Sequence, residues 1–482
     1  MSTRILPHVL LGAVATLTAC NDPSSVDSPY IVTPVTTTAL AGTPGWPLND
    51  TLVVEVRDAE GHLVPGAKVT WSLPSGGRLA VQLADAEDRM TGTTDSDGHN
   101  YAVWTLGLDE GTQVAKVAAG FGEPVTFAAS ATVLHAVSVS VASGYTCAVL
   151  SDNRPVCWGQ NQYGQLGTGD TLARATPTPV VGLPAVQEIQ VSNGYGAVTC
   201  ARDLAGDVWC WGYDPYGAGG PAASEAPQLL PSRVAGAEGA VSLALGPQYG
   251  GHTCAVFPGG GAKCWGYNGT GMLGTGDLVS SASPRTVIGN NSFSRVFASD
   301  DLTCALDSDG EVWCWGNVYN QLSPLPYGIY TSPVRPVPGY RFVSLAISWY
   351  GVCGIQPDGS TSCFGDWSAT GRPYPPPTRS GVTTEPVHPD LQPNLAEIGT
   401  DGARLMFGLS RYGETYFWGE YWENPDPTSR VIQRPRFVKI AGGYYQFCGI
   451  AESGGLYCGN IPRYQNPESR ISLFGVPSLV NP

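Results

Sequence analysis

The stretch Cys304-Ala-Leu-Asp-Ser-Asp-Gly-Glu-Val-Trp-Cys-Trp-Gly316 decides the fold of this 482-residue chain. It predicts two short strands joined by a tight turn at Ser308-Asp-Gly310. The same hairpin recurs six more times, and the copies begin at residues 147, 200, 254, 304, 353, 407 and 448. Repeats of about 50 residues built from short strands predict the blades of a β-propeller.

Six of the seven copies contain two cysteines ten residues apart. Directly opposed residues of a non-hydrogen-bonded pair in an antiparallel hairpin have α-carbons about 4.5 Å apart, which is near the span of a disulfide. The remaining copy has Phe407 and Phe417 at the two cysteine positions. The spacing therefore predicts six structural disulfides of about 2 kcal/mol each. The predicted pairs are Cys147–Cys157, Cys200–Cys210, Cys254–Cys264, Cys304–Cys314, Cys353–Cys363 and Cys448–Cys458.

The cysteines show no sign of redox or metal chemistry. The sequence has no Cys-x-x-Cys pair, and its six histidines do not cluster beside the cysteine pairs. Redox catalysis needs a close reactive pair, and a zinc site needs four convergent ligands. We therefore predict no metal site and no cofactor.

One repeat unit can be divided into strands and loops. The expected elements are strands at 136–143, 147–150 and 155–159, a Gly-rich loop at 160–170, and an outer strand at 176–181. The prolines of this outer strand suit an edge, where amide positions stay unpaired. We expect Trp158, Trp211, Trp265 and Trp315 of the Cys-Trp-Gly triplets to pack between blades.

Two of these loops carry a family resemblance. Cys157-Trp-Gly-Gln-Asn-Gln-Tyr-Gly-Gln-Leu-Gly-Thr-Gly-Asp170 and Cys264-Trp-Gly-Tyr-Asn-Gly-Thr-Gly-Met-Leu-Gly-Thr-Gly-Asp277 resemble the repeats of the regulator of chromosome condensation family. The resemblance implies a seven-bladed propeller over residues 134–482. It is strong in units one and three and fades in the others. We expect the segment Arg470–Phe474 to help close the ring against Ala136–Val141, which would remove exposed edge strands.

The N-terminus contains a targeting signal. Arg4 precedes an apolar run, and Leu17-Thr-Ala-Cys20 follows it. Residues 1–20 thus resemble a bacterial lipoprotein signal with its lipobox, lipidated at Cys20; the alternative is an ordinary secretory signal. The run is too short to span a bilayer, and residues 21–30 read as a flexible tether.

This resemblance implies a place in the cell envelope. The chain would be lipid-anchored outside the cytoplasm, in the periplasm or at the cell surface, with membrane contact only through the lipid. The cysteine count agrees with this location, because one lipobox cysteine and six disulfide pairs account for all 13 cysteines. Disulfides form in such oxidising compartments.

Residues 31–133 predict a β-sandwich, because about seven short strands fall within about 100 residues. Arg57-Asp-Ala-Glu-Gly-His-Leu-Val-Pro-Gly-Ala-Lys-Val-Thr-Trp71 and Thr94-Asp-Ser-Asp-Gly-His-Asn-Tyr-Ala-Val-Trp104 resemble bacterial immunoglobulin-like domains of the invasin type. This resemblance implies a spacer. Asp95 and Asp97 could suggest calcium, but turn capping is favoured. The fold class is thus all-β, an immunoglobulin-like sandwich followed by the propeller.

The chemistry-bearing residues favour binding over catalysis. The net charge of −15 argues against nucleic acid, whose recognition needs a basic surface. The sequence contains no nucleophile elbow, phosphate loop or metalloprotease motif. The acidic pair Asp300-Asp301 is expected to be solvated. We predict no reaction.

Aromatic residues mark the candidate binding face. Strands of a blade alternate in direction, so the turn between strands one and two shares a face with the loop between strands three and four. Tyr and Trp supply rigid contact area with a polar handle. The first set of turns offers Tyr145, Tyr195, Tyr249, Trp349, Tyr350, Tyr444 and Tyr445. The second offers Tyr163, Tyr213, Tyr216, Tyr267, Tyr319, Trp367, Tyr421 and Trp422.

The sequence thus predicts a monomeric binding or scaffold protein whose aromatic face takes an unidentified protein or polysaccharide. A propeller enzyme with its active site in the channel is one alternative. A guanine-nucleotide exchange regulator is another, implied by the family resemblance and opposed by the export signal.

Overall fold

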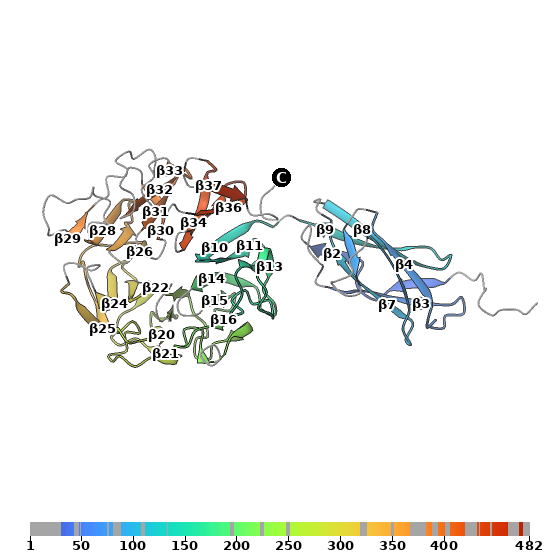
Figure 1. Ribbon diagram of the computed structural model, residues 1–482, viewed down its shortest axis with the longest axis horizontal. Coiled ribbons are helices and arrows are strands. Elements are labelled where there is room, and N and C mark those ends of the chain that lie inside the picture. Colours follow the sequence, from blue (N-terminus) through green and yellow to red (C-terminus); the bar gives the residue numbers. More distant parts are fainter. Residues whose placement is uncertain are drawn as a thin grey trace, which may run out of the picture. The chain divides into compact units, whose positions relative to one another are not determined.

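A computed structural model of the protein describes residues 30–42, 48, 50–74, 77–80, 88–107, 111–132, 134–192, 197–221, 226–246, 251–318, 325–348, 351–366, 382–387, 394–400, 405–419, 431–432, 434–443, 446–460 and 472–475. The chain divides into two compact units after residue 133 (Figure 1). Among the described residues, no helix has the length and apolar character needed to cross a membrane.

The N-terminal unit consists of two sheets. One sheet has the strand order β1-β3-β7-β5, and the other has the order β2-β9-β8-β4-β6 with β2 and β9 parallel. The strands are β1 (Ile31–Pro34), β2 (Ala39–Gly42), β3 (Leu52–Arg57), β4 (Lys68–Ser72), β5 (Arg78–Ala80), β6 (Arg89–Thr93), β7 (His99–Thr105), β8 (Gly111–Ala119) and β9 (Val125–Ala131).

One hydrophobic core draws on both sheets of this unit. Burial alternates along β3, so every second side chain enters the core. Trp71 of β4 lies 5.7 Å from Phe127 of β9 between ring centroids, and both are fully buried. At the Asp95 turn, one carboxylate oxygen accepts bonds from the backbone N–H groups of Asp97 and His99. Asp95 therefore caps its turn, which is the role that the sequence pattern favours over calcium binding.

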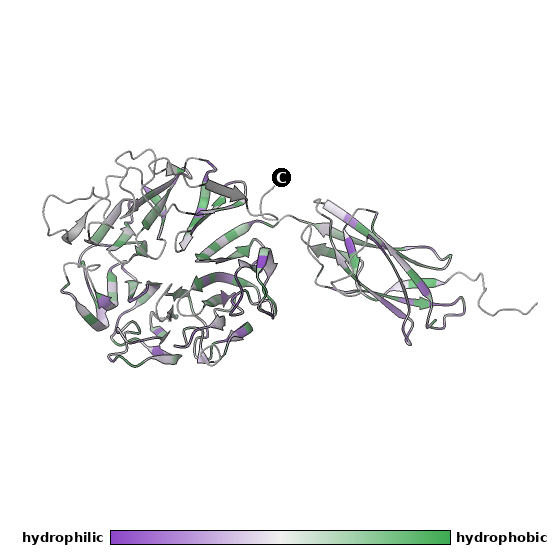
Figure 2. Cartoon of the chain, in the orientation of Figure 1, coloured by the Kyte–Doolittle hydropathy of each residue, from purple (hydrophilic) through white to green (hydrophobic). Residues whose placement is uncertain are grey.

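The C-terminal unit is a ring of blades (Figure 1), and its described strands form seven four-stranded sheets. In each sheet the strands are neighbours in chain order. The prediction of an all-β propeller is confirmed. Bands of hydrophobic residues alternate with hydrophilic ones along the strands (Figure 2).

The first four blades contain β10 (Ala136–Ala142), β11 (Tyr145–Leu150), β12 (Pro155–Gly159), β13 (Arg174–Pro179); β14 (Val186–Ser192), β15 (Ala197–Asp203), β16 (Val208–Tyr213), β17 (Gln228–Arg233); β18 (Ser242–Leu245), β19 (His252–Val256), β20 (Ala262–Gly266), β21 (Ser281–Thr286); and β22 (Phe293–Ala298), β23 (Leu302–Asp307), β24 (Val312–Val318), β25 (Gly328–Val334).

The last three blades contain β26 (Ser344–Ile347), β27 (Gly351–Ile355), β28 (Thr361–Asp366), β29 (Val382–Val387); β30 (Leu395–Thr400), β31 (Leu405–Ser410), β32 (Thr415–Gly419), β33 (Val431–Ile432); and β34 (Phe437–Gly443), β35 (Gln446–Ala451), β36 (Leu456–Asn460), β37 (Ser472–Gly475).

A disulfide joins the two central strands in six of the blades. Cys304 lies directly opposite Cys314 in the register of β23 and β24, as the turn position predicted. The six bridges link the expected pairs, with Cα–Cα distances of 4.0–4.1 Å. In the sixth blade, Phe407 and Phe417 are likewise opposed, and their ring centroids lie 6.1 Å apart.

The ring closes through its innermost strands. β34 of the last blade packs against β10 of the first (Figure 1). The approach is close, because a Cβ atom on Gly443 would lie 2.3 Å from the Val141 carbonyl oxygen. The expected closure by the C-terminal segment is wrong. β37 instead pairs with β36, where it covers the outer edge of its own blade.

Candidate binding face of the propeller

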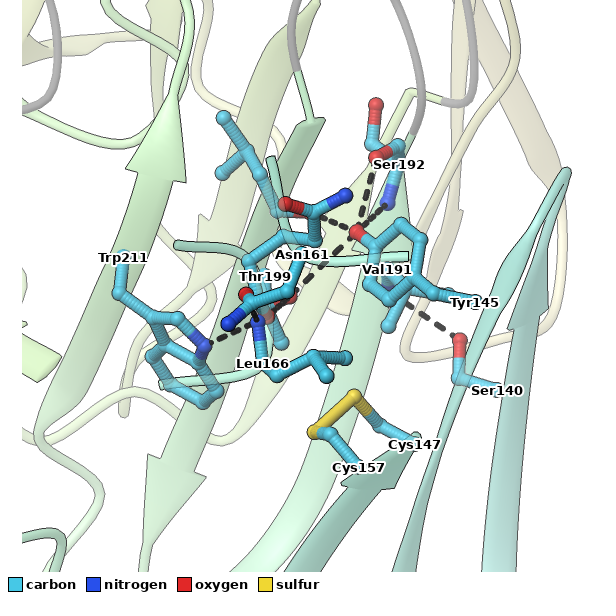
Figure 3. The surroundings of a disulfide bond; sticks show 12 residues. Ser140, Tyr145, Cys147, Cys157, Asn161, Leu166, Val191, Ser192, Thr199 and Trp211 are labelled. Atoms are coloured by element: carbon cyan, nitrogen blue, oxygen red, sulfur yellow. Dashed lines mark hydrogen bonds between the residues drawn. A yellow bond between two sulfur atoms is a disulfide. The ribbon is translucent and has the colours of Figure 1, made fainter. Parts of the chain in front are cut away.

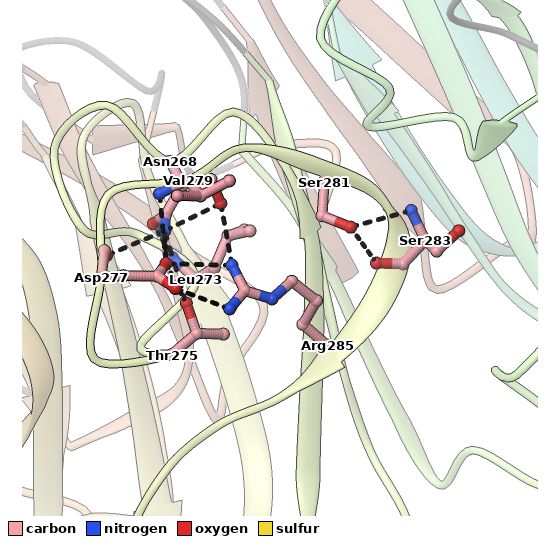
Figure 4. A network of polar contacts seen from close by, with 8 residues as sticks. All are labelled: Asn268, Leu273, Thr275, Asp277, Val279, Ser281, Ser283 and Arg285. Atoms are coloured by element: carbon pink, nitrogen blue, oxygen red, sulfur yellow. Dashed lines mark hydrogen bonds and ion pairs between the residues drawn. The ribbon is translucent and has the colours of Figure 1, made fainter.

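Short polar side chains shape the loops of the candidate face. In the third blade, Asn268 donates from Nδ2 to the Asp277 carbonyl oxygen at 3.0 Å and accepts at Oδ1 from Leu273 N–H at 2.9 Å (Figure 4). Asn161 makes the equivalent contacts to Asp170 and Leu166 in the first blade. One amide at the start of the loop thus satisfies a backbone group in the middle of the loop and another at its end.

An ion pair fastens the end of the same loop to the outer strand. Arg285 of β21 donates to both carboxylate oxygens of Asp277, at 2.7 and 2.9 Å (Figure 4). This guanidinium holds the pKa of Asp277 well below its usual range. Arg174 and Asp170 form the corresponding ion pair in the first blade.

Each of these loops is also clamped to the next blade. The backbone carbonyl oxygen of Gln165 accepts hydrogen bonds from Trp211 Nε1 and Thr199 Oγ1, both at 2.8 Å. The two donor side chains are labelled in Figure 3. In the same way, the backbone carbonyl oxygen of Ala218 accepts hydrogen bonds from Trp265 and Thr253. That of Met272 accepts hydrogen bonds from Trp315 and Thr303. We call this the cross-blade clamp. It gives a hydrogen-bond partner to a buried backbone carbonyl oxygen and to a buried indole N–H.

The register of the hairpin explains the cross-blade clamp. Thr199 precedes a cysteine, Trp211 follows the opposed cysteine, and the two residues face each other across β15 and β16. Their side chains therefore project toward the same neighbouring blade. The predicted inter-blade position is confirmed for Trp211, Trp265 and Trp315, which are fully buried. Trp158 is only half-buried.

Tyr145 does not belong to an accessible face, and its assignment to the partner-binding set is corrected. It is only 2% exposed. Its hydroxyl oxygen lies 2.8 Å from the carbonyl oxygen of Ser192 in the second blade (Figure 3) and 2.8 Å from that of Val198. Burial raises the pKa of this phenol. Tyr145 therefore joins two blades.

Four other predicted tyrosines form two pairs that each join neighbouring blades among the first three, and together they are here named the tyrosine row: Tyr163, Tyr213, Tyr216 and Tyr267. Tyr163 stacks on Tyr213 with ring centroids 6.0 Å apart, and Tyr216 meets Tyr267 edge-on at 4.9 Å. Tyr216 is 38% exposed, and the other three are half-buried. The row lies on the strand-three-to-four loops and adjoining strand ends.

Ten of the predicted face residues lie outside the described part of the chain. They are Tyr195, Tyr249, Tyr319, Trp349, Tyr350, Trp367, Tyr421, Trp422, Tyr444 and Tyr445.

The acidic pair on this face is buried at Asp300 and half-buried at Asp301, which corrects the expectation that both are solvated. Asp300 is 5% exposed, and burial raises the pKa of the neighbouring Asp301. His252 is fully buried nearby in the third blade, with Nε2 2.7 Å from Thr303 Oγ1. No three His, Cys, Asp or Glu residues in the described ranges come close enough together to hold a metal ion.

Comparisons with known proteins match the repeat architecture. Residues 157–201 and 293–321 match models of the regulator of chromosome condensation (RCC1) repeat. The chain is 29% identical to the ultraviolet-B receptor UVR8 of Arabidopsis thaliana over 58% of this chain and 64% of that protein. It is 28% identical to the E3 ubiquitin-protein ligase HERC2 of Homo sapiens over 46% of this chain and 5% of that protein. The chain thus spans less than two thirds of each relative.

Solved structures show the same fold. Human WBSCR16 superposes with a TM-score of 0.55 at 17% identity, over 80% of this chain and 100% of that one. Yeast RCC1 (Prp20), solved with bound Kap60, superposes with a TM-score of 0.51 at 18% identity, over 63% of this chain and 78% of that one. The blades and their clamped loops define a repeat propeller. Within the chain, the C-terminal unit is a β-propeller that carries RCC1-type repeats at residues 157–201 and 293–321.

Proposed function

We propose that the protein is a monomeric binding protein that uses the loop face of its propeller to hold a protein or polysaccharide outside the cytoplasm. The tyrosine row carries this proposal. It offers aromatic edges and hydroxyl groups on loops that the cross-blade clamps hold in place. Rigid aromatic contact area on a fixed scaffold is the composition of binding hot spots.

We place the protein in the bacterial cell envelope. The support is the lipobox-like Leu17-Thr-Ala-Cys20, which lies outside the described residues, with lipidation at Cys20. Six disulfides agree with an oxidising compartment. In this proposal the two-sheet N-terminal unit is an immunoglobulin-like spacer between lipid and propeller.

One solved structure gives this proposal a general precedent. The yeast RCC1 (Prp20) propeller was solved bound to Kap60. A propeller of this fold can therefore hold another protein. The partner of this chain is different in our proposal, because we propose that the chain is exported from the cytoplasm. We propose no reaction.

A capture experiment tests the proposed face. The chain beginning at Asn21, immobilised by its N-terminus, is exposed to envelope proteins and polysaccharides of the source cells. We expect the triple variant Tyr163→Ala, Tyr216→Ala, Tyr267→Ala to retain at least about tenfold less of the captured partner, because hot-spot aromatics dominate binding energy.

The matched control is Tyr412→Ala. Tyr412 is 68% exposed in the turn between β31 and β32, which strand alternation places on the opposite face. It should leave capture unchanged. Equal capture by the triple variant and the control, with both folded, would count against the tyrosine row as the binding site.

A further inference from the structure

A pocket lies at the junction of the sixth and seventh blades. Its volume is about 450 Å³, and it is lined by Arg434, Pro435, Arg436, Ala451, Glu452 and Ser453. The first three residues connect β33 to β34, and the last three enter the turn between β35 and β36. Glu452 N–H donates to the Arg436 carbonyl oxygen at 3.0 Å, which holds the two walls together.

The two arginines of the pocket differ from six arginines of the first four blades. In the first four blades, Arg154, Arg174, Arg202, Arg233, Arg285 and Arg335 each pair with an Asp or Glu. Arg434 and Arg436 are exposed, and neither guanidinium has an ion-pair or hydrogen-bond partner among the described residues. Two unpaired guanidinium groups beside a pocket, in a chain of net charge −15, favour an anionic ligand.

The rest of the lining narrows the ligand class. Glu452 and Ser453 can accept hydrogen bonds from hydroxyl groups, and the Pro435 ring offers an apolar surface. The Glu452 carboxylate would repel a doubly charged phosphate more than a singly charged carboxylate. A pocket of this volume suits a small ligand. We propose that it binds the uronate unit of an acidic saccharide, with the sugar carboxylate held by Arg434 and Arg436 and its hydroxyls by Glu452 and Ser453.

This site is separate from the tyrosine row. It uses the connections before strand one and between strands two and three, which strand alternation places on the opposite face. The inference therefore does not depend on the proposed function, and either can fail alone.

Calorimetric titration of the full chain with sodium glucuronate at low salt tests the proposal. We expect saturable binding with a dissociation constant on the order of 1 mM, as for a ligand of this size. The double variant Arg434→Gln, Arg436→Gln should bind at least about tenfold more weakly, and added salt should weaken the wild type.

Arg341→Gln is the matched control. Arg341 is exposed and directly precedes Phe342, as Arg436 directly precedes Phe437. The two phenylalanines are also equivalent in their backbone bonds: Phe342 N–H donates to the Gly310 carbonyl oxygen, and Phe437 N–H donates to the Gly413 carbonyl oxygen. It should bind glucuronate like the wild type. Glucose should not bind, and Glu452→Gln should narrow the preference for glucuronate over inorganic phosphate.

Three outcomes would overturn the proposal. One is absence of glucuronate binding, and another is unchanged binding by the double arginine variant. The third is wild-type binding of inorganic phosphate as tight as that of glucuronate, because it would mark a general anion site.

Discussion

At the scale of single residues, the burial of His252 makes the folding stability of the protein depend on pH. Its ring is fully buried between blades, and a Cβ atom on Gly246 would lie 2.8 Å from Nδ1. Burial lowers the pKa of His252 from its ordinary 6.5 to about 4. The unfolded chain therefore takes up a proton at a higher pH than the folded chain. The stability that neutral His252 contributes is complete above pH 6.5 and is lost as the pH falls toward 4.

We predict that His252→Gln makes stability less sensitive to acid. Gln446 occupies the equivalent position, two residues before a cysteine, in the seventh blade. Between pH 7 and pH 4, the wild type should lose about 3 kcal/mol more unfolding free energy than the variant. Guanidinium unfolding of both proteins at the two pH values measures the difference. Parallel losses would show that His252 does not carry this acid sensitivity.

At the scale of elements, the disulfide hairpin is the repeated stabilising unit. Each bridge joins opposed residues of two central strands and is almost completely excluded from solvent. The sixth blade shows an alternative solution, since Phe407 and Phe417 fill the same positions and pack on Phe447 at 5.6 and 5.3 Å. A covalent link is replaced there by buried aromatic area.

We predict that the double variant Cys304→Ala, Cys314→Ala loses about 2 to 3 kcal/mol of unfolding free energy, because its unfolded chain is no longer constrained by the short loop. Chemical denaturation measures the loss, and thiol titration under denaturing conditions checks that the other cysteines stay paired. A midpoint equal to that of the wild type would contradict a stabilising role for the hairpin bridge.

At the scale of the whole molecule, ring closure rests on packing of β34 against β10. Gly443 permits the approach, since any side chain there would meet the Val141 backbone at 2.3 Å. No rotamer relieves a clash between a Cβ atom and backbone. The closing contact must therefore separate to admit even alanine.

We predict that Gly443→Ala destabilises the propeller by about 1 to 3 kcal/mol, the usual cost of overpacking. Limited proteolysis should cut the variant faster near residues 134–142. Gly261→Ala is the control, because its Cβ atom would meet no heavy atom within 4 Å. Equal rates of proteolysis for the two variants would show that the contact between β34 and β10 accommodates a Cβ atom at Gly443 without strain.

Much of this architecture could be predicted from the hairpin repeat alone. The Cys304–Cys314 register followed from the turn position, and the loop at 160–170 lies where its glycines predicted. The closure could not be predicted, because a short apolar segment such as Ser472–Gly475 fits either edge of a sheet. Only the three-dimensional structure shows that it pairs with β36.

The candidate site was predicted less well than the fold. Tyr145 and Tyr216 look alike in sequence, yet one bridges blades and the other is partly exposed. Two residues before a cysteine, a side chain points to the neighbouring blade, and that rule could have identified Tyr145. The arginine pocket gave no sequence signal, because Arg434 and Glu452 meet only through the fold.

The short span of every disulfide has a consequence for how the chain matures. In each of the six pairs the second cysteine follows the first by ten residues, and none of these bridges joins one blade to another. In the export that we propose, the bond of each pair can close as the polypeptide emerges from a translocation pore, before the cysteines of the next pair appear. Oxidation in order of emergence then yields the native pairing, without a disulfide isomerase to correct it.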